Sequence, residues 1–197
     1  DWQMNAKSSL ERAADAWLSG NSAIEAVEFA RARSEVARTG QPERVARVEL
    51  LRCATRAASL VFEPCAGFEA LATDAAPAEQ AYARYLAGQA QAADAPLLPD
   101  AHRSLTVATA PESALANIKD PLSRLVAAGV LFQRGAASPA VAAVAVDTAS
   151  AQGWRRPLLA WLQVQQARAQ AGGAVDEAAR LQRRIDLVAP PLPSAPK

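Results

Sequence analysis

The sequence predicts an all-α fold of about 8–9 helices that pair as antiparallel hairpins. Alanine makes up about a quarter of the 197 residues, and aromatic residues make up only 5%. This composition is typical of close-packed helices rather than sheets. Apolar residues recur at helical spacing along most of the chain, and glycine or proline separates one such stretch from the next.

Residues 45–65 are predicted to carry the central helix of the N-terminal half. Pro42 suits its first turn, where the missing N–H would have no partner. Apolar or small residues then cover so much of the helix surface that neighbours are needed on two sides. These residues are Val45, Val48, Leu50, Leu51, Cys53, Thr55, Ala57, Ala58, Val61 and Phe62. Pro64 is expected to end the helix, because proline cannot continue its hydrogen-bond ladder.

Cys53 and Cys65, the only two cysteines, both lie on this segment. If the chain reverses after Leu60, the residues from Val61 onward have a reach of roughly 15 Å, enough to bring the two sulfurs together. An even cysteine count favours a disulfide formed in an oxidising compartment. The alternative is two buried free thiols, which behave as small apolar residues.

Two helices are expected ahead of this central one. The first runs from near Ala6 to Leu18, and Ser22 with Glu25 forms a capping box at the start of the second. On the second helix, the inward residues are Phe29, Ala32 and Val36, and the solvent-facing residues are Glu28, Arg31, Glu35 and Arg38.

Another helix is predicted after the cysteine segment, with Asp74 as its cap and Pro77 in its first turn. Tyr82 and Tyr85 share one face of this helix. They are interpreted either as the edge of the core, with hydroxyls that reach water, or as the floor of a groove.

Four regions follow from these patterns: an N-terminal helical half (1–93), a proline-interrupted connector (94–120), C-terminal helical hairpins (121–189) and a proline-rich tail (190–197). Short helical pieces are expected in the connector at 100–107 and 112–118. His102, the only histidine, is interpreted as a surface residue rather than a catalyst. Asp120–Pro121 and Ser138–Pro139 are expected to start the first two C-terminal helices.

The net charge of +1 gives no electrostatic case for nucleic acid or an acidic membrane surface. Residues 121–197 nevertheless hold nine basic and four acidic residues, a local excess of five. This excess is interpreted either as an ordinary solvated face or as a surface for an acidic partner. The candidate partner surface comprises Tyr82, Tyr85, Arg155, Arg156, Arg183 and Arg184.

The chain starts at Asp1 without a basic and apolar leader, so a cleaved targeting segment or a trimmed end is expected. Its longest apolar runs fall short of the ~20 residues of a membrane-spanning helix. We expect a soluble chain that associates with a membrane only through a removed leader or an N-terminal lipid anchor.

The chain resembles a tetratricopeptide-type (TPR-like), α-solenoid-like array in three features. The first hairpin has small residues and a terminating proline where such repeats place them, and the tripeptide Ala-Trp-Leu occurs twice. The residues are Ala30, Ala37, Pro42, Ala16-Trp17-Leu18 and Ala160-Trp161-Leu162. The aromatic and glycine signature of the first repeat helix is absent, and the period is irregular. The chain is also similar to uncharacterised proteobacterial envelope proteins, which implies a periplasmic or envelope location and no activity.

The sequence contains no G-x-x-x-x-G-K-[ST], G-x-G-x-x-G, G-x-S-x-G or H-E-x-x-H motif, so no catalytic, cofactor or metal residues are predicted. We therefore expect a non-catalytic protein-interaction or accessory subunit of a bacterial cell-envelope assembly, with a protein partner and no small-molecule substrate. One alternative is a small helical hydrolase of cell-wall or lipid material that uses Glu63, Glu69 or Asp74. The other is a carrier for an apolar ligand between the two helical halves.

Overall fold

A computed structural model describes residues 1–106 and 111–189 of the chain. Every regular element within these ranges is helical, which confirms the predicted all-α fold. The number of helices is larger than expected, because residues 66–74 and the predicted connector form several short ones. No helix in the described part of the chain is both long enough and apolar enough to span a membrane.

The α-helices are α1 (Trp2–Leu18), α2 (Ser22–Ala37), α3 (Pro42–Ala58), α4 (Ala66–Glu69), α5 (Pro77–Leu86), α6 (Pro111–Ala116), α7 (Pro121–Gln133), α8 (Pro139–Gln152), α9 (Arg155–Ala171) and α10 (Val175–Val188). The 3₁₀ helices are η1 (Ala72–Asp74), η2 (Ala92–Leu97) and η3 (Asp100–Thr106).

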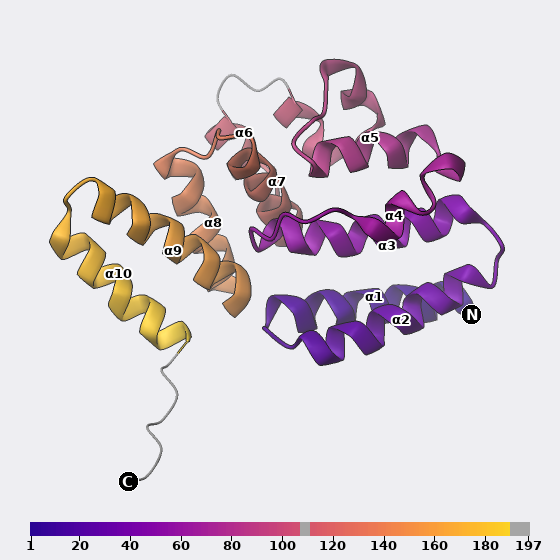
Figure 1. Ribbon diagram of the computed structural model, residues 1–197, viewed down its shortest axis with the longest axis horizontal. Coiled ribbons are helices and arrows are strands. Elements are labelled where there is room, and N and C mark those ends of the chain that lie inside the picture. The colour runs from indigo at the N-terminus through magenta and orange to yellow at the C-terminus, as the bar shows by residue number, and fades with distance from the viewer. Residues whose placement is uncertain (107–110, 190–197) are drawn as a thin grey trace, which may run out of the picture.

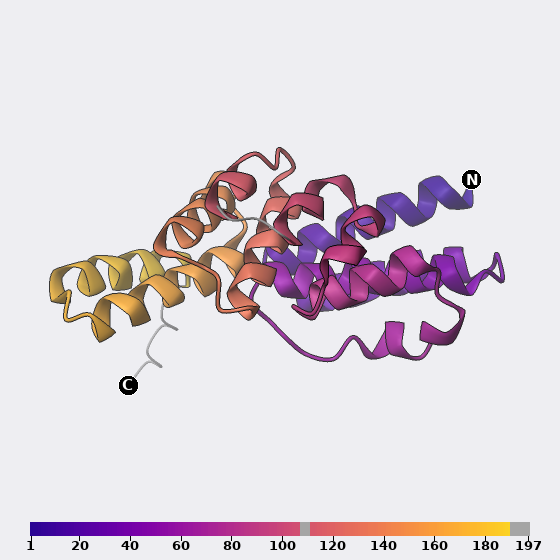
Figure 2. The same ribbon diagram turned by 90° about the horizontal axis from the view of Figure 1, so that it is seen from above.

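Helices α1–α5 lie beside one another at one end of the long axis, α6 and α7 lie near the middle, and α8–α10 extend toward the other end (Figure 1). The α1–α2 pair packs along α3, and α5 packs on another side of α3. Helix α7 crosses α3 and leads through α8 to the α9–α10 hairpin, which projects at the end opposite the N-terminus (Figure 2). Helix α3 therefore has neighbours on several sides, as its wide apolar surface predicted.

The main core is continuous from Leu18 of α1 to Ile185 of α10, and it includes residues of the predicted connector. Leu50 of α3 is 1% exposed at its centre. Helices α3 and α7 approach so closely that a Cβ on Gly129 would overlap the carbonyl oxygen of Ala57. A glycine at this point of α7 is therefore a condition for the crossing. A second cluster, which contains Phe29, lies between α1, α2 and α3.

Helix α3 ends at Ala58, so the prediction that Pro64 ends it was wrong. Leu60 adopts a left-handed conformation with φ of 61°. The N–H groups of Leu60 and Val61 then bond to the carbonyls of Ala57 and Arg56, the pattern of a Schellman motif. The chain thus reverses at the point where the cysteine argument placed the reversal.

The helix caps correct three predictions. The N-cap of α2 is Asn21, whose side chain accepts a hydrogen bond from the Ile24 N–H at 3.1 Å, so Ser22 and Glu25 form no capping box. Asp74 ends η1 and does not cap α5, whose N-cap is Ala76. Helix α1 starts at Trp2 rather than near Ala6, because the side chain of Asp1 caps it. Asp120 and Ser138 cap α7 and α8 as predicted.

The predicted connector contains η2, η3 and α6. The expected helical pieces at 100–107 and 112–118 correspond to η3 and α6, except that residue 107 lies outside the described residues. The predicted proline-rich tail, 190–197, also lies outside them.

Candidate functional site

Buried carboxylates join the helices of the N-terminal half. Each is less than 9% exposed, and each pairs with an arginine of a neighbouring element. The pairs are Glu28 with Arg12, Glu25 with Arg52 and Arg56, Glu49 with Arg33, Glu79 with Arg47, and Asp94 with Arg84. Glu28 was predicted to face solvent, and this prediction was wrong, although the inward positions of Phe29, Ala32 and Val36 are confirmed.

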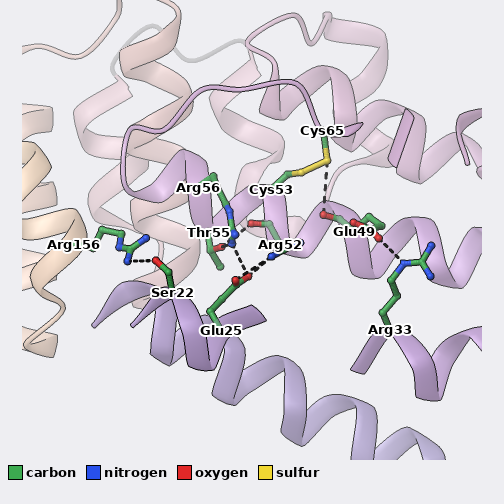
Figure 3. A network of polar contacts seen from close by, with 10 residues as sticks. All are labelled: Ser22, Glu25, Arg33, Glu49, Arg52, Cys53, Thr55, Arg56, Cys65 and Arg156. Atoms are coloured by element: carbon green, nitrogen blue, oxygen red, sulfur yellow. Dashed lines mark hydrogen bonds and ion pairs between the residues drawn. A yellow bond between two sulfur atoms is a disulfide. The ribbon is translucent and has the colours of Figure 1, made fainter. Parts of the chain in front are cut away.

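Glu25 is the centre of the largest of these clusters (Figure 3). It is 3% exposed and accepts hydrogen bonds from Arg52 Nε at 2.8 Å, Arg52 Nη2 at 3.1 Å and Arg56 Nη1 at 2.8 Å. Burial alone would raise the pKa of Glu25, but the hydrogen bonds from the two arginines lower it below its ordinary value. The ionised carboxylate therefore fixes α2 against α3.

Trp17 connects this cluster to the C-terminal half of the molecule. The Arg56 and Arg156 guanidinium carbons lie 3.8 and 3.7 Å from the centre of the indole ring. Arg156 Nη2 also donates to Ser22 Oγ at 2.8 Å (Figure 3). Cation–π contacts of this kind stabilise the association of the α1–α2 pair with α9.

The candidate partner residues do not form one surface. Tyr85 is 1% exposed and is not available to a partner, and Arg156 is engaged with Trp17. Arg155 donates to the Val188 carbonyl oxygen at 3.0 Å. Arg183 is exposed on α10 and Arg184 is half-buried there, whereas Tyr82 lies half-buried on α5.

His102 is buried, so its prediction as a surface residue was wrong. It is 3% exposed, and its Nδ1 lies 2.8 Å from the Tyr85 hydroxyl. The rings of Tyr82 and Tyr85 lie 6.1 and 4.9 Å from the imidazole ring. Burial lowers the pKa of His102 to about 4, against an opposing effect of Asp120, so the ring is neutral at pH 7. The sequence analysis did not predict this contact. The one feature that could have indicated it is that the hydroxyl of a buried tyrosine requires a hydrogen-bond partner.

The predicted disulfide between Cys53 and Cys65 is confirmed, with 6.0 Å between the two Cα atoms. It holds the loop 61–65 beside α3, where the loop forms one wall of a cleft of about 740 Å³. Glu63 and Glu69 line this cleft and are exposed, whereas Asp74 is exposed outside it. The cleft thus contains two of the three candidate carboxylates, and the third lies outside it.

A second cleft, of about 300 Å³, lies where α7 and η3 meet the N-terminal helices. Its polar wall includes Tyr82, His102 and Asp120, and most of its remaining lining is apolar. No group of three or more histidine, cysteine or acidic side chains in residues 1–106 and 111–189 is arranged to hold a metal ion.

The outer face of α2 is apolar and exposed. Ile24 is 51% exposed and Val27 is 53% exposed, although α2 packs against both α1 and α3. Small exposed residues extend this face along the helix. Together they form the α2 strip, which comprises Ala23, Ile24, Ala26, Val27, Ala30 and Ala37.

Comparison of the chain with protein-family models, with curated proteins and with solved structures found no match.

Proposed function

We propose that the chain is a non-catalytic protein-interaction or accessory subunit of a bacterial cell-envelope assembly, with TPR-like hairpins and with the α2 strip as its contact surface. The observation that carries this proposal is the exposure of Ile24 and Val27 on the outer face of α2. Contiguous exposed apolar patches are uncommon on monomers and mark sites where another protein binds.

The shape of the α2 strip suits a partner helix. Alanine at four of its six positions lets another backbone approach closely, and the two larger side chains can fill gaps between side chains of the partner. The occupant of this surface is therefore an amphipathic helix of another protein.

The ion pairs of α2 support a preformed surface. Glu25 and Glu28 each bind two arginines, and Arg33 binds Glu49 of α3. A surface that is already ordered loses little conformational entropy when a partner binds.

The disulfide supports the compartment in this proposal. Structural disulfides form and persist in oxidising compartments, of which the bacterial periplasm is one. Mass spectrometry of the unreduced protein from its native cell tests this part, and two free thiols would contradict an envelope location.

Affinity purification of the tagged chain from the native membrane fraction tests the interaction. We expect one stoichiometric partner, and the double variant Ile24→Glu/Val27→Glu should bind it about 100-fold more weakly, because two desolvated carboxylates would lie in an apolar interface. The matched control is Val175→Glu/Leu187→Glu, which changes two side chains that are 75% and 84% exposed on α10. Retention of the partner by the α2 variant, or its loss from the control alone, would refute the proposal.

A further inference from the structure

The second cleft has the composition of a small-molecule site. Its apolar wall combines side chains from α1, α2, α3 and α7. The main contributors are Leu10, Ala13, Phe29, Leu51, Leu122 and Val126. Ligand sites in proteins are typically apolar hollows with a few polar groups that orient the ligand.

His102 supplies one of these polar groups. Its Nδ1 is occupied by the Tyr85 hydroxyl at 2.8 Å. We assign the ring proton to Nε2, the tautomer in which the Tyr85 O–H donates to Nδ1 and no tyrosine proton is left unpaired inside the core. Nε2 has no hydrogen-bond partner in residues 1–106 and 111–189, yet it is not among the polar atoms sealed from solvent there. In this tautomer Nε2–H is a donor without a partner among the described residues, on a ring that is 3% exposed and lines the cleft.

Tyr82 supplies a second donor beside the first. Its ring stacks on Tyr85 at 6.1 Å and lies at the same distance from His102. Tyr82 also lines the cleft, and its hydroxyl has no hydrogen-bond partner in the described part of the chain. Burial raises the pKa of Tyr82, so the hydroxyl keeps its proton.

The charges around the cleft disfavour an anionic ligand. Glu11, Glu25 and Asp120 line it, and Arg52, which also lines it, binds Glu25 through Nε and Nη2. A carboxylate in this cleft would lie near three carboxylates and would meet two donors that carry no charge. A neutral oxygen acceptor meets the same donors without this repulsion.

We propose that this cleft binds a small, uncharged, mainly apolar molecule whose carbonyl-type oxygen accepts hydrogen bonds from His102 Nε2 and the Tyr82 hydroxyl. The volume of the cleft, about 300 Å³, corresponds to about ten water molecules at about 30 Å³ each. The cleft therefore accommodates a ligand of about ten non-hydrogen atoms. Binding at this site is independent of the α2 strip, so it goes beyond the proposed function and can succeed or fail separately from it.

Three probes of similar size test this assignment. Propiophenone has a ketone oxygen, propylbenzene lacks an acceptor, and benzoate carries a negative charge. The imidazole resonances of His102 report binding without ambiguity, because the chain has only one histidine. We expect propiophenone to shift these resonances and to bind at least about tenfold more tightly than propylbenzene, with no binding of benzoate.

Two variants separate the hydrogen bonds from the apolar contacts. Tyr82→Phe removes a hydroxyl that has no partner among the described residues, and it should reduce the preference for propiophenone over propylbenzene severalfold. His102→Phe removes the other donor and should reduce the preference by a similar factor while propylbenzene still binds. Binding to this variant is followed by the NMR signals of the probes, because the variant lacks the imidazole. The proposal is overturned if propiophenone leaves the His102 resonances of the wild type unchanged at 1 mM, if benzoate binds as well as the ketone, or if neither variant reduces the preference.

Discussion

Replacement of Glu25 by glutamine tests the role of the buried ion pairs. The change keeps the size of the side chain but removes the charge that three arginine N–H groups contact at 2.8–3.1 Å. Removing one partner of a buried pair typically costs about 3–5 kcal/mol, because the remaining charge loses its compensation. Arg52 is 33% exposed and can be hydrated, whereas Arg56 is 12% exposed and cannot rehydrate without leaving Trp17. We therefore expect the lower end of this range, about 3 kcal/mol.

Urea unfolding at pH 7, followed by circular dichroism, measures this loss. A loss of about 3 kcal/mol should lower the thermal midpoint by roughly 6–12 °C in a domain of this size. The matched control is Glu177→Gln, because Glu177 also binds an arginine, Arg180 at 2.7 Å, but both side chains are about half exposed. The control should leave the midpoint unchanged. Equal effects of the two variants, or a loss of less than about 1 kcal/mol for Glu25→Gln, would refute the reasoning.

Three further predictions concern the disulfide, the helix crossing and the histidine. Replacing Cys53 and Cys65 by serine should lower the free energy of unfolding by about 3 kcal/mol, as expected for a cross-link across 12 residues. Urea titrations with and without reductant measure this loss. Equal stability of the oxidised and reduced protein would contradict the prediction. Gly129→Ala should lower the free energy of unfolding by about 1–3 kcal/mol, because the new Cβ would overlap the Ala57 backbone. Gly172→Ala is the control, since its Cβ would have its nearest contact at 3.4 Å and should leave the stability nearly unchanged in the same titration. Similar stabilities of the two variants would rule out the close crossing. Because the pKa of His102 falls from 6.5 to about 4 on folding, the unfolded state binds the proton first as the pH falls. The wild type should therefore lose about 3 kcal/mol more than His102→Phe between pH 7.5 and pH 4, and parallel losses in the two proteins would show that this histidine is not buried.

The central helix was predictable because its signals are local. Pro42 marks its start, and the apolar residues that follow occur at a spacing that only a helix can bury. The disulfide was predictable for the same reason, since it requires only that the chain reverse between Cys53 and Cys65. Leu60 performs this reversal in a conformation that glycine usually adopts, which explains why Pro64 was the more visible but incorrect stop signal.

The pairing of charges between helices was not predictable from spacing. Glu25 stands three residues after Ser22, which satisfies the pattern of a capping box, and Glu28 stands three residues before Arg31, which satisfies that of a surface pair. Glu25 instead binds arginines of α3, and Glu28 binds Arg12 of α1 in addition to Arg31. A pattern within one helix contains no information about which neighbour faces it.

The buried histidine was missed for a similar reason. His102 lies among prolines and beside Arg103, a context typical of a surface loop. Helix η3 places it against Tyr82 and Tyr85 of α5, which are 20 and 17 residues away in the sequence. The candidate ligand site therefore depends on tertiary contacts between segments that look unrelated in the sequence.

Site-specific photo-crosslinking tests most directly whether the α2 strip is the surface through which the protein works. A photoreactive residue at Val27 in the native cell should give one dominant crosslinked product with a single protein, and the same residue at Leu187 of α10 should give none. Leu187 is 84% exposed and Val27 is 53% exposed, so lower access to solvent would not explain the absence of a product at Leu187. No product at Val27, or the same product at both positions, would contradict the account.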